Sequence, residues 1–133
     1  MGLAKEHIVL VVDDETEIRR VVTKVFKRNF PEARLHEAQD GLEAGQLILD
    51  TLPDLVILDL KIPGADGFKI CGNIRSDRRF RNTKILAITG QDTQEYKNRV
   101  LGAGADDYLP KPFEVKVLLE KSSRLLDFPE SIQ

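Results

Sequence analysis

Short apolar runs alternate along the chain with longer segments in which apolar residues recur every three or four positions. The run from Ile8 to Val12 is continuous and rich in β-branched residues, which is typical of a strand buried on both faces. The pattern predicts five strands and five helices in alternation. The expected strands cover Ile8 to Val12, about Arg34 to Glu37, Asp54 to Asp59, Lys84 to Thr89 and Ala105 to Leu109.

A helix is expected after each strand. The predicted helices cover about Ile18 to Asn29, Asp40 to Asp50, Phe68 to Ser76, Thr93 to Leu101, and a last segment that begins at Phe113 and ends near Leu126. Asp40 with Glu43, and Asp92 with Glu95, resemble N-terminal capping boxes. Such boxes satisfy backbone N–H groups at a helix start, so each pair predicts where a helix begins.

Alternating strands and helices predict a parallel sheet with right-handed crossovers and helices on both of its faces. The 133 residues correspond to one domain, large enough to bury a hydrophobic core. We expect a single domain over residues 1–133, with its core at about 7–126 and a short C-terminal tail at 127–133. No internal repeat or low-complexity linker divides the chain.

Composition and charge exclude several classes of protein. Hydrophobic residues make up 41% of the chain and charged residues 32%, the balance of a soluble globular protein. A formal charge of -2 disfavours direct binding to nucleic acid, because phosphate contacts need clustered lysine and arginine. The basic stretch from Arg75 to Lys84 is interpreted as a solvated helix end and loop. Lone Cys71 excludes an internal disulfide and is expected to be buried.

Nothing in the sequence predicts association with a membrane. No apolar stretch approaches the roughly 20 residues needed to span a bilayer. The N-terminal apolar run is too short for a signal peptide and ends in acidic residues. We therefore expect a cytoplasmic protein.

Acidic side chains follow two of the predicted buried strands. Asp13 and Asp14 end the first strand, and Asp59 ends the third. The carboxyl ends of parallel strands meet at one edge of an open α/β sheet, where ligands bind. Three carboxylates together are unfavourable unless a cation or protons offset their charge. The sequence therefore predicts a divalent-metal site, and Thr89 and Lys111 should lie in the same crevice.

These residues lie in four stretches that together resemble the receiver domain of two-component response regulators. The stretches are Val11-Val12-Asp13-Asp14-Glu15, Leu58-Asp59-Leu60-Lys61-Ile62-Pro63-Gly64-Ala65-Asp66-Gly67, Ile88-Thr89-Gly90, and Ala103-Gly104-Ala105-Asp106-Asp107-Tyr108-Leu109-Pro110-Lys111-Pro112-Phe113. The resemblance covers essentially the whole chain. It implies a doubly wound, flavodoxin-like (βα)5 α/β sandwich of three layers, with sheet order 2-1-3-4-5, a fold that the chemotaxis receiver exemplifies.

The resemblance also implies a role for each residue of the pocket. Asp59 would accept a phosphoryl group from a phosphohistidine, giving an acyl phosphate. Asp14, Asp59 and the backbone carbonyl of Lys61 would bind Mg²⁺ directly, with Mn²⁺ as a substitute, and Asp13 would act through a bound water. Lys111 and the Thr89 hydroxyl would contact the phosphoryl oxygens. Gly90 would leave room for the donor, and Lys111-Pro112 would be a cis peptide.

A switch and its tuning are implied in the same way. Thr89 would move toward the phosphoryl group, and Tyr108 would rotate inward into the vacated space. The readout face would be the fourth helix, the fifth strand and the fifth helix. Lys61 and Gln91 occupy positions that tune phosphoryl lifetime in the family, and Lys61 predicts slow self-dephosphorylation.

The implied partners are a histidine kinase or a histidine phosphotransfer protein, and a downstream protein or a covalently linked output domain. A phosphorylation-dependent dimer is also compatible with the resemblance. The chain would be a signalling switch rather than an enzyme acting on external substrates. It could be free-standing or excised from a longer regulator or hybrid kinase.

Three other readings of the same pattern stay open. A flavodoxin-like electron carrier should have a Ser/Thr/Gly-rich phosphate loop where Asp13 and Asp14 stand. A haloacid-type phosphatase should have a second aspartate where Lys61 stands. A pseudo-receiver would switch without phosphate and act as a protein-interaction module.

Overall fold

The computed structural model describes residues 6–126, and the predicted tail at 127–133 lies outside the described residues. Five strands and five α-helices alternate, as the sequence predicts. The strands are β1 (Ile8–Val12), β2 (Arg34–Ala38), β3 (Leu55–Asp59), β4 (Lys84–Thr89) and β5 (Asp107–Pro110). The α-helices are α1 (Thr16–Asn29), α2 (Gly41–Thr51), α3 (Gly67–Ser76), α4 (Gln94–Gly102) and α5 (Val115–Leu125).

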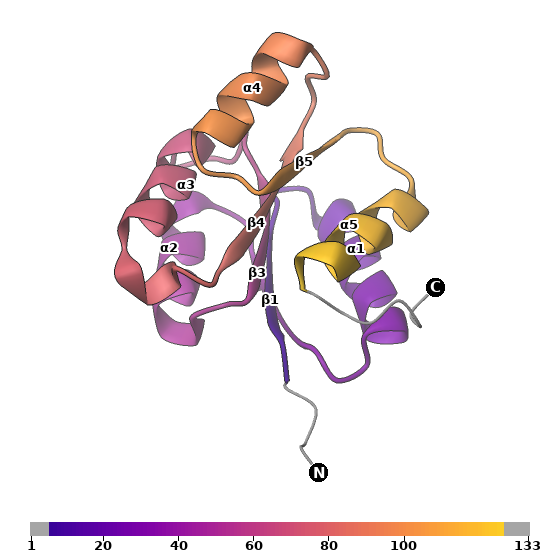
Figure 1. The fold of residues 1–133 in the computed structure, drawn as a ribbon. Helices are drawn as coiled ribbons and strands as arrows, with labels where there is room; N and C mark the ends of the chain where they lie inside the picture. Colours follow the sequence, from indigo (N-terminus) through magenta and orange to yellow (C-terminus); the bar gives the residue numbers. More distant parts are fainter. Residues whose placement is uncertain (1–5, 127–133) are drawn as a thin grey trace.

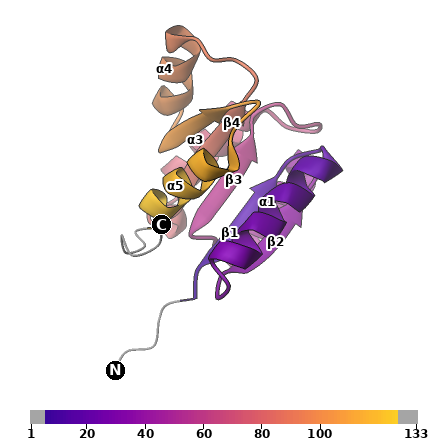
Figure 2. The ribbon, with the colours of Figure 1, turned by 90° about the vertical axis from the view of Figure 1, so that its right-hand side faces the viewer.

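All strand pairs are parallel, and the sheet order is β2-β1-β3-β4-β5. This confirms the predicted fold class and order. Helices cover both faces, with α2 and α3 on one side of the sheet and α1 and α5 on the other (Figure 1). Turned by 90°, the view shows α1 and α5 lying side by side across the strands (Figure 2).

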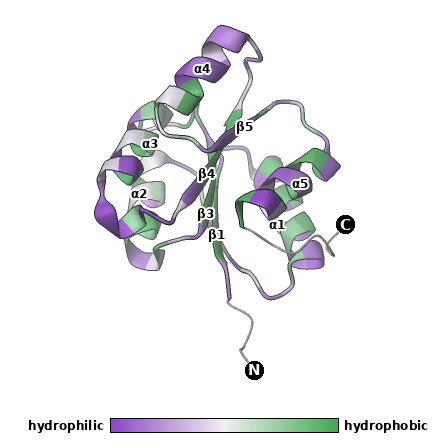
Figure 3. Cartoon of the chain, viewed as in Figure 1, coloured by the Kyte–Doolittle hydropathy of each residue, from purple (hydrophilic) through white to green (hydrophobic). Residues whose placement is uncertain are grey.

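Two apolar clusters hold the three layers together, one on each face of the sheet. Alternate residues of each central strand point to opposite faces, so that Val9 and Val11 join one cluster while Leu10 and Val12 join the other. Phe26 of α1, which is fully buried, packs into the first cluster. Figure 3 shows hydrophobic colour along the strands and hydrophilic colour over much of α4. The strand ends that carry the chemistry are therefore fixed by a core on both sides.

The loop after β3 depends on a close approach between two segments of backbone. A Cβ atom added at Gly67 would lie 2.7 Å from the Cα of Leu60, so only glycine fits there. Asp66 then caps α3, because its side chain accepts a hydrogen bond from the Phe68 N–H. This contact fixes the path of the chain from Asp59 to α3.

Two predicted boundaries are wrong by two residues each. Strand β5 begins at Asp107 rather than Ala105, because the Asp106 N–H donates to the Ile85 carbonyl and its carboxylate accepts from the Ile85 N–H. Asp106 thus binds the backbone near the start of β4. Helix α5 begins at Val115, after the N-cap residue Glu114, rather than at Phe113.

The predicted capping box at the start of α4 is also wrong. Thr93 is the N-cap, and its hydroxyl accepts a hydrogen bond from the Tyr96 N–H at 3.1 Å. The Asp92 carboxylate instead accepts a hydrogen bond from the Tyr108 phenol. At α2 the prediction is confirmed in its main feature, because Asp40 accepts from the Glu43 N–H.

Two smaller findings concern the basic stretch from Arg75 to Lys84 and the single cysteine. The basic stretch contains a 3-10 helix, η1 (Arg78–Phe80), whose arginines are exposed, in agreement with a solvated interpretation. Cys71 is fully buried, as predicted, and this burial raises the pKa of its thiol to about 11.

Within residues 6–126, none of the helices has the length and apolar character that crossing a membrane requires.

Candidate functional site

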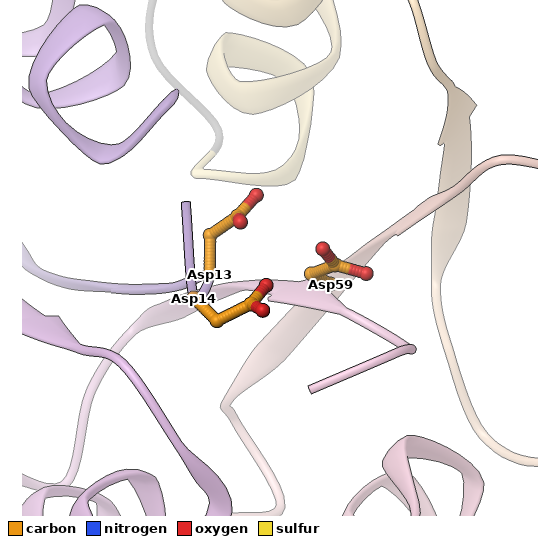
Figure 4. Close-up of side chains that lie close together, drawn as sticks. All are labelled: Asp13, Asp14 and Asp59. Carbon is orange, nitrogen blue, oxygen red and sulfur yellow. The ribbon is translucent and has the colours of Figure 1, made fainter. Parts of the chain in front are cut away.

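Three carboxylates gather where β1 and β3 end. Asp13 and Asp14 follow β1, and Asp59 is the last residue of β3. One carboxylate oxygen from each lies within 4.8 Å of the others, and Figure 4 shows the three side chains around a common space. Asp13 and Asp59 are 2% and 7% exposed, whereas Asp14 is open to solvent. The predicted acidic pocket is therefore present and has one open side.

Backbone contacts hold the two buried carboxylates in place. Asp13 Oδ1 accepts a hydrogen bond from the Glu15 N–H at 2.9 Å, and Asp59 Oδ1 accepts one from the Lys61 N–H at 2.9 Å. Each aspartate thus bonds to the backbone two residues further along the chain, in the turn that leaves its strand. The second oxygen of each carboxylate, Oδ2, lies on the side of the pocket that Lys111 occupies.

Lys111 reaches the pocket from the connector that follows edge strand β5. Its N–H donates to the Thr89 carbonyl at 2.7 Å, which ties the connector after β5 to the end of β4. The Lys111-Pro112 peptide is cis, as the resemblance implied. This backbone contact holds Lys111 at the carboxyl end of β4, whatever its side chain contacts.

The Lys111 ammonium contacts three carboxylates at once. Its Nζ lies 3.0 Å from Asp59 Oδ2, 3.1 Å from Asp13 Oδ2 and 3.0 Å from Glu15 Oε1. Partial burial alone would lower the pKa of Lys111, but the hydrogen bonds to Asp59, Glu15 and Asp13 together raise it above its ordinary value. The lysine stays protonated and is the cation that offsets the pocket's charge in this structure.

The pKa of Asp13 is raised from its ordinary value of 3.8, mainly because burial disfavours the charged carboxylate. The Glu15 N–H and the Lys111 ammonium both lower the pKa of Asp13, and the charge of Asp59 raises it further. The contacts with Glu15 and Lys111 therefore do not fully offset the unfavourable burial of the Asp13 charge.

Thr89 is the last residue of β4, and Gln91 lies beside it in the turn that follows. The Thr89 side chain is buried, and its hydroxyl oxygen accepts a hydrogen bond from the Gln91 N–H at 3.0 Å. Gln91 itself is exposed. A Cβ atom added at Gly90 would have no atom within 4 Å, so the space above this turn is open.

Tyr108 lies apart from the pocket. Its phenol donates a 2.6 Å hydrogen bond to Asp92, and the Lys97 ammonium lies 5.3 Å from its ring centroid. The bond to Asp92 is the main cause that raises the pKa of Tyr108 above its ordinary value. The ring therefore occupies an outward position on the edge strand, and Lys61 likewise exposes its side chain.

Sequence reasoning missed two contributors to this region. The sequence places Glu15 in a motif without indicating a role for its side chain, yet Glu15 contacts Lys111. Asp92 was expected to cap a helix, yet it binds Tyr108. A contact between Glu15 and Lys111 joins residues 96 positions apart, and no local pattern in the sequence encodes it.

The chain matches a known family over most of its length. The family model for the response regulator receiver domain matches residues 9–123. Response regulator MprA of Mycobacterium sp. (strain KMS) is 40% identical over 118 residues, which cover 89% of this chain and 50% of that protein. MprA of Mycobacterium ulcerans (strain Agy99) is 37% identical over the same length. The chain thus spans about half the length of the curated relatives it matches.

Solved structures agree with this match. The signal receiver domain of a DNA binding response regulator protein from Colwellia psychrerythraea 34H has a TM-score of 0.86 at 30% identity, covering 92% of this chain and 99% of that chain. Chemotaxis response regulator CheY4 of Vibrio cholerae has a TM-score of 0.83 at 29% identity, covering 91% of this chain and 99% of that chain. The similarity extends over whole receiver structures.

Proposed function

Because the chain belongs to the response regulator receiver domain family, we propose that it accepts a phosphoryl group on Asp59. The donor would be the phosphohistidine of a histidine kinase or of a histidine phosphotransfer protein. The observation that carries the proposal is the contact between Lys111 Nζ and Asp59 Oδ2 at 3.0 Å, inside a group of three carboxylates. A carboxylate nucleophile beside a fixed cation is the arrangement that phosphoryl transfer needs.

The donor set of the pocket suits a hard divalent cation. Three carboxylates with ligand atoms within 4.8 Å match the oxygen ligands that Mg²⁺ prefers. We propose that Asp14, Asp59 and the Lys61 carbonyl bind the ion directly, with Asp13 acting through water, and that Mn²⁺ can replace it. When bound, the ion would neutralise charge on the oxygens of the transferring group.

The chemical step needs little from the protein besides position and charge. An Asp59 oxygen attacks phosphorus, the phosphorus–nitrogen bond of the donor breaks, and the released imidazole takes up a proton. The product is an acyl phosphate. The Lys111 ammonium keeps its proton and exchanges carboxylate contacts for phosphoryl oxygens. The Thr89 hydroxyl donates to another oxygen, and the open space above Gly90 admits the donor.

The added charge then changes the edge of the sheet. Phosphorylation adds roughly -1.5 to -2 charges at one position. Thr89 moves toward the new group, and Tyr108 leaves Asp92 and rotates inward. The surface formed by α4, β5 and α5 is thereby altered, and a downstream protein, a linked output domain or a second copy of the chain binds one of the two states better.

Intact mass tests the proposal directly. The protein is incubated with acetyl phosphate, with and without Mg²⁺, beside the Asp59→Asn variant. We expect a gain of one phosphoryl group that requires the metal and is absent in the variant. If no adduct forms, beryllofluoride, which mimics the phosphoryl group without hydrolysing, separates two explanations. Binding of beryllofluoride means rapid hydrolysis, whereas no binding would identify a pseudo-receiver and overturn the proposal.

A further inference from the structure

Glu15 stands at the start of α1 but does not cap it. The residue occupies the N-cap position, and its side chain makes no capping hydrogen bond. Glu15 Oε1 instead accepts a hydrogen bond from Lys111 Nζ at 3.0 Å. The Glu15 side chain is 59% exposed, so the carboxylate reaches the lysine along the open side of the pocket. The local helix therefore does not explain where this side chain lies.

The Lys111 ammonium is surrounded by carboxylates: it donates hydrogen bonds to Glu15 and Asp59 and forms an ion pair with Asp13. A lysine ammonium offers three N–H donors, and the structure gives it three carboxylate neighbours, Asp13, Glu15 and Asp59. A phosphoryl group that is to contact Lys111 therefore competes with these carboxylates and displaces the one that is held least firmly. The identity of the displaced carboxylate decides how readily the pocket accepts the group.

The three carboxylates differ in what else can bind them. Asp13 and Asp59 belong to the group that could hold a metal ion, whereas Glu15 does not. A bound cation would share the charge of Asp13 and Asp59 and weaken their hold on Lys111. Glu15 would keep its full charge, so its contact with the lysine persists when the pocket is loaded.

We propose that Glu15 is a positioning residue that competes with the phosphoryl group for Lys111 and so lowers the pocket's affinity for that group. The inference rests on the proposed function of Asp59 as the acceptor. With acetyl phosphate as donor, an Asp59 oxygen bonds to phosphorus, the phosphorus–oxygen bond breaks, and acetate leaves with the electron pair. Glu15 is released from Lys111 during this exchange and forms no bond to phosphorus.

Two matched variants separate contact from charge. Glu17→Gln removes the same charge from an exposed residue in the first turn of α1, and the described contacts of the Lys111 ammonium do not include Glu17. Glu15→Asp keeps the charge but shortens the side chain by one methylene group, which takes the carboxylate away from the lysine. Competition for Lys111 predicts that Glu15→Asp behaves like Glu15→Gln and that Glu17→Gln behaves like the wild type.

The experiment measures beryllofluoride affinity by calorimetry in the presence of Mg²⁺, together with the rate of phosphorylation by acetyl phosphate. Exposed ion pairs have modest strength, so Glu15→Gln should bind beryllofluoride about two- to fivefold more tightly than the wild type and react faster by a similar factor. The ratio should shrink as sodium chloride is raised, because salt screens the exposed contact. A purely structural effect of the substitution would not respond to salt in this way.

The outcomes distinguish this inference from the proposed function. Equal affinities of wild type and Glu15→Gln, with the wild type phosphorylated on Asp59, would overturn the inference alone. A Glu15→Asp variant that matches the wild type, or an affinity ratio that does not change with salt, would do the same. A folded wild type that neither binds beryllofluoride nor gains a phosphoryl group would overturn both.

Discussion

The acidic pocket and the outer part of β5 both carry residues of the proposed switch, yet they hold their side chains differently. In the pocket, Asp13 and Asp59 are buried and Lys111 binds both of them. On β5, Tyr108 is half-buried, and its phenol binds the exposed Asp92. The pocket lies at the ends of interior strands β1 and β3, whereas β5 is an edge strand.

This difference follows from where each strand lies in the sheet. Interior strands have neighbours on both sides and a core on both faces, so the residues at their ends have little freedom. An edge strand has one neighbouring strand, and its outward side chains form contacts with other residues at the surface. The buried acids of the pocket thus come from the middle of the sheet, whereas Tyr108, one of the two residues proposed to move, comes from its edge. Substitutions in the pocket should therefore have larger effects than substitutions at the edge.

The largest effect is expected from Lys111→Ala. The change leaves Asp13 and Asp59 buried beside each other without their cation, and we expect the free energy of unfolding to fall by about 1–3 kcal/mol. Added Mg²⁺ should restore much of the loss, because it supplies the missing positive charge. Chemical denaturation with and without Mg²⁺ measures both effects.

Lys121→Ala is the matched control for this prediction. Lys121 binds a single acid, Asp107, with its Nζ 3.0 Å from Oδ1, away from the pocket. The change in the free energy of unfolding that Lys121→Ala causes should be the same with and without Mg²⁺. The prediction is wrong if Lys111→Ala has the same free energy of unfolding as the wild type. It is also wrong if Mg²⁺ raises the free energy of unfolding of both variants equally.

A second effect, on phosphoryl lifetime, is expected from Lys61→Asn. The Lys61 N–H donates a hydrogen bond to Asp59 in the pocket, whereas the Lys61 side chain is exposed. Lys61 thus has a fixed backbone, as in the pocket, and an exposed side chain, as at the edge. The lysine would hinder the attacking water or shield the acyl phosphate, and its replacement by asparagine should speed dephosphorylation severalfold. The decay of phosphorylated protein followed by intact mass provides the measurement. Lys69→Asn, an exposed lysine on α3, is the control; equal decay in wild type and Lys61→Asn rejects the prediction.

A third effect is expected on the pH dependence of stability. Burial raises the pKa of Asp13, so the folded protein holds this proton to higher pH than the unfolded chain does. The folded state therefore loses stability as the pH rises from 3.8 through the raised pKa. Asp13→Asn removes the titration and should be more stable than the wild type at neutral pH. The difference should shrink as the pH falls through this window.

Asp77→Asn should show the opposite sign. Hydrogen bonds from Arg79 lower the pKa of Asp77, so its contribution is present above the ordinary carboxyl pKa and is lost as the pH falls. Thermal or urea unfolding across the acid range compares the two variants. A wild type more stable than Asp13→Asn at neutral pH would mean that Lys111 compensates Asp13 fully.

The smallest effect on stability is expected from Asp92→Ala at the edge. The contact is exposed, so the free energy of unfolding should change by no more than about 0.5 kcal/mol. The pKa of Tyr108 should nevertheless fall back toward its ordinary value of 10.0, because its acceptor is gone. The chain has two tyrosines and no tryptophan, so tyrosinate absorbance in a Tyr96→Phe background reports on Tyr108 alone. Glu95→Ala is the control, and an unchanged Tyr108 pKa in Asp92→Ala would show that the edge contact does not hold the ring.

Much of the fold could be predicted from the sequence because its signals are local. Strand β1 is a continuous apolar run, and Asp40 caps α2 three residues before its N–H partner Glu43. The errors occur where a side chain has a choice between local and distant partners. Asp92 could have capped α4, but the Tyr108 phenol binds it. Asp106 lies outside β5 because it binds Ile85 near the start of β4.

The sequence by itself determined the alternation of strands and helices, the family, and the acids at the strand ends. These follow from periodicity and from residues a few positions apart, whose geometry the backbone sets. Only the tertiary structure decided that Lys111 binds Glu15 as well as Asp13 and Asp59, and that Tyr108 faces outward to Asp92. Contacts between residues that are distant in the chain depend on strand order, register and rotamer together, and no local pattern carries that information.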